Sequence, residues 1–141
     1  MKTLQDPAIL AGRLLLAFVS IVEGWLKLTH YDAIVAYMQA YGVSGKLLPL
    51  VILTELGGGL LIAFGLFSRI AAFALAGFAL LTALFFHRDF ADEIQSINFM
   101  KNMAIAGGFL LLTAFGPGGW SIDGWRSGRH GSTAGLERSR P

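Results

Sequence analysis

Several ionisable side chains lie inside segments that are apolar enough to cross a membrane. Glu23 and Lys27 lie near the end of the first such segment, Glu55 lies in the second, and Lys101 lies in the fourth. A charge at bilayer depth costs roughly 2.5 to 3.5 kcal/mol on insertion scales, so such residues normally face a partner or a polar cavity. Carboxylate and ammonium groups in such a cavity can hold a polar head group or relay a proton. These residues are therefore the first candidates for a functional site.

Further polar residues join these four at helical spacing. Glu23 and Lys27 are i, i+4 with the acid first, which favours an ion pair within one helix, and Asn98 and Asn102 share a helix face by the same spacing. A rise of about 1.5 Å per residue places all these groups, with the histidine that ends the third span, in the membrane half opposite the termini. The candidate ligand-binding or proton-relay residues are Glu23, Lys27, Glu55, His87, Asn98, Lys101 and Asn102.

A charge-balanced network would make these residues tolerable in a membrane. We expect Glu23 to pair with Lys27 and Glu55 with Lys101, because opposite charges must cancel when they are buried. Glycines at 57–59 and 107–108 predict close contact between the second and fourth spans, which would bring Glu55 towards Lys101. The alternative is that the charges only hold the helices together, since polar contacts between membrane helices contribute about 0.6 kcal/mol on average.

Other site chemistries are less favoured by the residues present. The chain has no cysteine, which excludes thiolate nucleophiles, disulfide exchange and iron–sulfur ligation by this chain. His30 and His87 end two spans at the same face, but a haem held between helices takes deeper ligands. We predict no metal site, and the catalytic residues stay unknown. Nucleic-acid binding is not expected, because basic residues beside a span are topology determinants.

The elements that carry these residues are membrane helices. Of 141 residues, 55% are hydrophobic and 14% are charged, against about 25% charged in soluble domains. Four segments approach the roughly 20 residues that a spanning helix needs, and they cover residues 8–28, 47–67, 68–87 and 98–116. The sequence therefore predicts an all-α fold, an integral membrane four-helix bundle.

The two longer connections predict short interfacial helices. In residues 30–45, Ile34, Met38 and Tyr41 recur at helical spacing, and residues 88–97 space their apolar side chains similarly. Residues 1–125 form one transmembrane domain in this interpretation, and residues 126–141 form a flexible basic tail. Arg13, within the first span, is expected to extend towards the interface.

Basic residues predict the orientation of the bundle. Lys2, Arg69 and four tail arginines lie on the side of the termini, against Lys27, Lys46, Arg88 and Lys101 on the other side. The positive-inside rule therefore predicts a multi-pass membrane protein with cytoplasmic N- and C-termini. A small-residue face of the third span, at Ala72, Ala76 and Ala79, permits a homodimer, and lipid could cover this face equally well.

Four segments together resemble a known family. GRLLLAFVSIVEGWLKL, LTELGGGLLIAFGLFSRIAA, NFMKNMAIAGG and GPGGWSID occur in this order between residues 8 and 123. They resemble the DoxX family of small four-helix bacterial membrane proteins, and this resemblance implies a location in the bacterial cytoplasmic (inner) membrane. That family takes its name from a subunit of an archaeal thiosulfate:quinone oxidoreductase, and some members are linked to oxidative-stress complexes. The resemblance implies quinone-linked redox work and assigns no catalytic residue.

Two functions follow as hypotheses. The first is a membrane subunit that binds a quinone-like small molecule, the candidate cofactor, for a redox-protein partner or an oxidative-stress complex. Such a subunit would not catalyse a reaction alone. Phe85, Phe86 and Phe90 are candidates for the apolar wall of its binding site. The second is a non-enzymatic assembly or interaction protein. A small-solute or proton carrier is less favoured, because inverted repeats and broken helices are not recognisable in the sequence. In each case the lipid bilayer is the surrounding partner.

Overall fold

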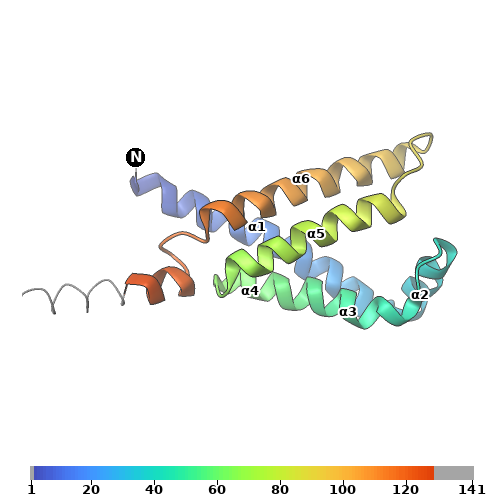
Figure 1. Ribbon diagram of the computed structural model, residues 1–141, viewed down its shortest axis with the longest axis horizontal. Helices are drawn as coiled ribbons and strands as arrows, with labels where there is room; N and C mark the ends of the chain where they lie inside the picture. Colours follow the sequence, from blue (N-terminus) through green and yellow to red (C-terminus); the bar gives the residue numbers. More distant parts are fainter. Residues whose placement is uncertain (1, 129–141) are drawn as a thin grey trace, which may run out of the picture.

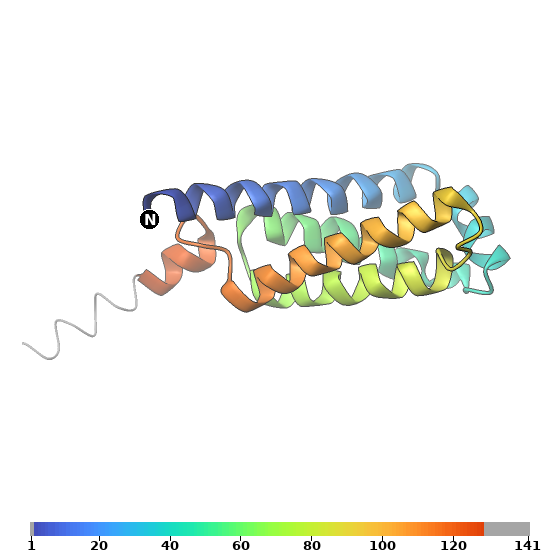
Figure 2. The same cartoon turned by 90° about the horizontal axis from the view of Figure 1, so that it is seen from above.

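The chain folds into helices, and the structure, a computed structural model, describes residues 2–128. Four helical segments in this part are long and apolar enough to cross a membrane, and they cover Leu4–Thr29, Gly45–Phe64, Ser68–Phe86 and Glu93–Phe115. They run alongside one another as a bundle (Figures 1 and 2). The predicted fold class, an all-α membrane four-helix bundle, is therefore confirmed.

The first span continues into the short helix that the sequence predicts. Helix α1 (Lys2–Thr29) contains the whole first span, and α2 (Tyr31–Ala40) follows after a single residue. Met38 of α2 is buried against Leu48 and Ile52 of the second span. Helix α2 is therefore folded back onto the bundle at the end away from the termini, which we call the distal end (Figure 1).

The second long connection differs from the expected one. Helix α5 (Ser68–Phe86) ends as predicted, but α6 (Glu93–Phe115) begins at Glu93 rather than at residue 98. Asp92 explains this start, because its carboxylate accepts hydrogen bonds from the N–H groups of Ile94 at 2.8 Å and Gln95 at 3.4 Å, as a good N-cap does. Residues 93–97 thus form the first turn of α6, and no separate helix occupies residues 88–92.

The second span is a composite of four short helical pieces. They are η1 (Gly45–Leu47), α3 (Leu48–Ile52), η2 (Leu53–Gly57) and α4 (Gly58–Phe64), which follow one another without a break. Pro49 lies in the first turn of α3, where its missing N–H costs no helical hydrogen bond. Segment η2 is a π-helical turn that carries Glu55. Such turns are rare, and they occur frequently at functional sites.

Glycines determine which spans lie against each other. A Cβ atom at Gly24 of α1 would lie 2.9 Å from the backbone nitrogen of Leu56 in η2, and one at Gly59 of α4 would lie 3.2 Å from the nitrogen of Ile21 in α1. The missing side chains let α1 approach the second span closely. Helices α5 and α6 form the other close pair, and α4 joins the two pairs by contacting α5.

The predicted contact between the second and fourth spans is wrong. A Cβ atom at Gly58 would meet Leu75 of α5, one at Gly108 would meet Leu16 of α1, and one at Gly107 would meet nothing within 4 Å. Small residues permit close approach but do not specify the partner helix. Because the second span lies against α1, Glu55 faces α1.

The apolar core fills the half of the bundle nearer the termini. Its buried residues come from α1, α4, α5 and α6, and they are Ala17, Ile62, Ala71, Ala72, Leu75, Ala76, Phe109 and Leu112. Large apolar side chains cover the outer surface, among them Leu15, Ile70, Phe73 and Phe115. A soluble monomer rarely exposes such a surface, and a bilayer covers it.

The alanines predicted to face a second copy of the chain are buried instead. Ala72, Ala76 and Ala79 are 0%, 1% and 5% exposed. The reason is that α6 and α4 lie against this side of α5. These alanines are therefore not exposed on the surface, where a second copy of the chain could contact them.

Polar bonds close the end of the bundle at which the termini lie. Arg13 is 4% exposed and donates to the carbonyl oxygens of Pro117 and Trp120, each at 2.9 Å. Its guanidinium therefore extends along the span to the loop at this end of the bundle and is buried beneath that loop. Asp123 accepts hydrogen bonds from the N–H groups of Phe67 at 3.0 Å and Ser68 at 2.8 Å, which caps α5.

The segment after the fourth span is helical over residues 122–128. The predicted boundary between the transmembrane domain and the tail, at residue 126, falls within this helical segment. Residues 129–141 of the predicted tail lie outside the described part of the chain.

The close approach at Gly24 gives the first prediction. Gly24→Ala should lower stability by about 1–3 kcal/mol, the usual cost of overpacking, because the new methyl group meets backbone atoms that cannot rotate away. Gly12→Ala is the matched control on the same helix, since a Cβ atom there meets nothing within 4 Å. Unfolding of the purified variants in mixed micelles measures both. Equal tolerance of the two alanines would contradict the proposed packing.

The buried guanidinium gives the second prediction. Arg13→Met should destabilise the fold by about 1.5–3 kcal/mol, because hydrogen bonds to a charged group are lost and two carbonyl oxygens lose their donor. Arg69→Met is the control, since exposed Arg69 also donates to two carbonyl oxygens, those of Thr113 and Ala114. Thermal unfolding in detergent should show the larger loss for Arg13→Met, and a larger loss for Arg69→Met would refute this ranking.

Candidate functional site

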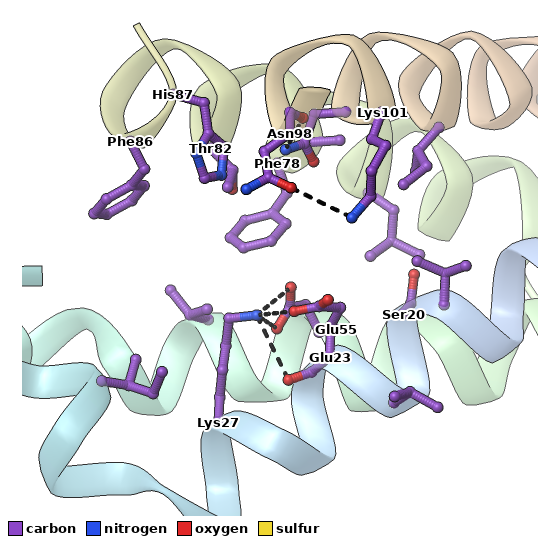
Figure 3. A pocket seen from close by; sticks show the side chains of 18 of the residues that line it. Ser20, Glu23, Lys27, Glu55, Phe78, Thr82, Phe86, His87, Asn98 and Lys101 are labelled. Atoms are coloured by element: carbon purple, nitrogen blue, oxygen red, sulfur yellow. Dashed lines mark hydrogen bonds and ion pairs between the residues drawn. The ribbon is translucent and has the colours of Figure 1, made fainter. Parts of the chain in front are cut away.

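The seven predicted site residues all line one cavity in the distal half of the bundle. This distal cavity has a volume of about 550 Å³, within the range of about 300–1,000 Å³ that is usual for small-molecule sites. It lies between the α1–second span pair and the α5–α6 pair (Figure 3). The residues chosen by their spacing along the sequence therefore lie around one cavity, and they are Glu23, Lys27, Glu55, His87, Asn98, Lys101 and Asn102.

One wall carries two carboxylates that share a single ammonium group, and we call Glu23, Lys27 and Glu55 the Lys27 cluster. Lys27 Nζ lies 3.0 Å from Glu23 Oε2 and donates to Glu55 Oε1 at 3.1 Å. It also lies 3.0 Å from Glu55 Oε2, which is buried and accepts no hydrogen bond. Glu55 is 6% exposed, so its charge depends on this one contact.

The expected pair of Glu55 with Lys101 is therefore wrong. Glu55 bonds Lys27 because the glycine at position 24 lets η2 approach α1, with a Cβ atom there only 3.1 Å from Glu55 Cβ. The expected pair of Glu23 with Lys27 is present. Two carboxylates on one ammonium leave this wall with a formal charge of −1.

The opposite wall carries the polar face of α6, formed by Asn98, Lys101 and Asn102. Lys101 Nζ donates to Asn98 Oδ1 at 3.4 Å, a long bond, and Asn102 donates to the carbonyl oxygen of Asn98 at 3.1 Å. Within residues 2–128, Lys101 makes no ion pair with a carboxylate. Figure 3 shows Lys101 and Asn98 across the cavity from the Lys27 cluster, with the Phe78 ring between them.

Aromatic and hydrogen-bonded side chains complete the site. His87 Nδ1 lies 3.1 Å from Gln95 Oε1, and Gln95 donates to the Tyr41 hydroxyl at 2.9 Å. Because an amide oxygen only accepts, Nδ1 carries the proton in this arrangement. Of the three phenylalanines expected at the wall, Phe86 lines the cavity, whereas Phe85 and Phe90 do not.

Sequence reasoning missed some lining residues. Ser20 is 6% exposed and lies at i−3 from Glu23 and i−7 from Lys27, so helical spacing could have found it. Phe78 and Thr82 lie in an uninterrupted apolar run. Nothing in that run distinguishes the cavity face from the lipid face.

The walls together can hold an amphiphilic small molecule. Lys101 can donate to an oxygen acceptor, and Glu55 can accept a proton or a hydrogen bond. The remaining lining is aromatic and aliphatic. Groups of three or more metal-binding side chains do not occur within residues 2–128.

Comparisons with known proteins agree with this architecture. The family model DoxX matches residues 8–88. The chain is 52% identical over 123 residues to "Inner membrane protein YqjF" of Escherichia coli (strain K12), which covers 87% of this chain and 95% of that protein. It is 34% identical over 122 residues to "Inner membrane protein YphA" of the same organism, covering 82% and 87%. No solved structure matches the chain. With four spanning helices and a family match over most of its length, the chain belongs to the DoxX family.

Proposed function

We propose that this chain is a subunit of the bacterial cytoplasmic membrane that binds a quinone-like molecule in the distal cavity for a redox partner. The observation that carries the proposal is the position of Lys101. It is a cation without an acid partner in the described residues, and it faces a wall with one excess carboxylate across an aromatic-lined space. A quinone head has oxygens on opposite sides, so it can reach both walls at once.

The two walls suit the two redox forms of such a head group. Lys101 and Asn102 offer donors to one oxygen. When the head takes up two electrons, each of its two oxygens also takes up one proton. Lys101 can give a proton to the oxygen beside it, and half-exposed Glu23 can take a proton from the aqueous side and pass it through Glu55 to the other oxygen. In this proposal the electrons come from the redox partner, and the chain has no cysteine with which to ligate an iron–sulfur cluster of its own. The chain therefore supplies binding and proton transfer and does not catalyse alone.

The location within the cell follows from the relatives and from the charges. Both relatives are named inner membrane proteins. Lys27 and Lys101 line the cavity, which leaves Lys46 and Arg88 as the distal basic residues outside it. Lys2, Arg69 and Arg126 lie at the end of the bundle where the termini are. This distribution supports cytoplasmic termini under the positive-inside rule.

A binding measurement tests the proposal. Purified protein in nanodiscs should bind decylubiquinone, and Lys101→Met should weaken binding about tenfold or more, because a hydrogen bond to a charged group is worth about 1.5–3 kcal/mol. Glu55→Gln should also weaken binding. The matched controls are Lys46→Met and Glu93→Gln, at exposed residues that do not line the cavity. Native mass spectrometry reports occupancy, and unchanged occupancy in both site variants would overturn the proposal.

A second function, a non-enzymatic assembly role, is favoured by one observation. The Lys27 cluster joins α1 to η2, so its charges can fix how these two elements lie together. In that case the cluster acts by stability alone, and the cavity needs no ligand.

A double-mutant cycle separates these roles. Lys27→Met should destabilise the fold by about 3–5 kcal/mol, because it leaves Glu55 buried without its partner. Lys27→Met combined with Glu55→Gln should recover much of this loss, whereas Lys101→Met should change stability little. Unfolding in mixed micelles measures each variant. A stable double variant that keeps full cellular redox tolerance would favour the assembly role, and a stable double variant that loses tolerance would favour the ligand site.

A further inference from the structure

The distal cavity has two long edges, and one of them is bridged. Between the second span and α5, Tyr37 of α2 stacks on Phe86 with ring centroids 5.5 Å apart, and Tyr41 meets the same ring at 5.5 Å. The Gln95–Tyr41 hydrogen bond adds α6 to this contact. Burial, with the hydrogen bond and charge of Tyr41, raises the pKa of Tyr37 to about 12. Tyr37 therefore stays uncharged at physiological pH.

The other edge, between α1 and α6, is open. The two helices meet where a Cβ atom at Gly108 would lie 3.0 Å from Leu16. Farther towards the distal end they separate, as Figure 1 shows. In residues 2–128, hydrogen bonds, ion pairs and ring contacts that join α1 directly to α6 are absent beyond Leu16. Phe18 and Val22 line the cavity from α1 and are still 64% and 37% exposed.

Polarity changes in one direction along this opening. Glu23, 52% exposed in its side chain, and Lys101 lie at its distal part, whereas Phe18 and Ile105 lie deeper. Five residues of helix separate Glu23 from Phe18, which corresponds to about 7 to 8 Å at 1.5 Å per residue. A molecule in the opening would therefore place a polar head at interfacial height and an apolar tail towards the membrane centre.

We infer that the cavity takes its ligand from the bilayer, sideways between α1 and α6, and that this ligand is a membrane-dissolved amphiphile with its tail against Phe18 and Val22. The inference rests on the proposed binding function and adds the route and the class of ligand. Two observations support the inference. The cavity is closed by ring contacts at Phe86, and Val22 on the opposite edge is partly exposed. A bilayer-facing opening gives a long apolar tail a place to remain in lipid, which an opening to water does not.

The chain has no cysteine, so a single one can be introduced and blocked. Val22→Cys places a thiol in the opening, and Leu15→Cys, on the same helix, is the matched control because Leu15 is 69% exposed and does not line the cavity. Each variant is alkylated with N-benzylmaleimide in nanodiscs. Uptake of decylubiquinone from the bilayer and of the tail-less water-soluble ubiquinone-0 is then followed by native mass spectrometry.

The benzyl adduct at position 22 should slow decylubiquinone uptake at least tenfold, and the adduct at position 15 should leave it unchanged. Bound decylubiquinone should also protect the cysteine of Val22→Cys, but not that of Leu15→Cys, from the maleimide. This protection is measured on folded protein that has not yet been alkylated. Uptake that is unaffected by the adduct at position 22, while Lys101→Met still weakens binding, would overturn the side route and leave the binding function standing. Equal binding of ubiquinone-0 and decylubiquinone would overturn the amphiphile class. Failure of the unmodified protein to bind either molecule would remove the binding function and this inference together.

Discussion

The close approach of α1 to the second span is the constraint on which the rest of the structure depends. It exists because glycines at positions 24 and 59 remove the side chains that would hold the backbones apart. In lipid the helices gain little from apolar burial, so such close contacts decide which helices pair. Once α1 and the second span form one pair, α5 and α6 form the other. The space between these two helix pairs is the distal cavity, and the charged side chains of both pairs line it.

The two ends of the bundle differ because their polar groups are satisfied differently. Near the termini, Arg13 and Asp123 bond backbone groups of loops and of a helix start, and these bonds fill the space between spans. At the distal end the ammonium of Lys27 donates to both carboxylates of one wall, those of Glu23 and Glu55. Lys101 makes only a long hydrogen bond to Asn98. The apolar core lies mainly in the half near the termini. The distal half is therefore the part of the bundle where a ligand can be accommodated.

The sequence predicted what depends on local pattern. Apolar length predicted the four spans, and helix rise predicted that Glu23, Glu55 and Lys101 share one membrane half. The i, i+4 rule predicted the bond between Glu23 and Lys27. It could not predict which carboxylate Lys27 would also bind, because that depends on which helices pair, and small residues occur on several faces of each span. The π-helical turn at Leu53–Gly57 has no local signal either, yet it carries the buried carboxylate.

The composition of the Lys27 cluster is the strongest reason to regard the site as more than a structural contact. A pair needed only to join two helices would be neutral, with one acid and one base, because each further buried charge adds a desolvation cost. Here Glu55 is buried with one oxygen that accepts no hydrogen bond, while its ammonium partner is shared with Glu23. The matching positive charge, Lys101, lies on the other side of the cavity. Charges that balance only across a cavity favour a ligand whose own polar groups bond both walls.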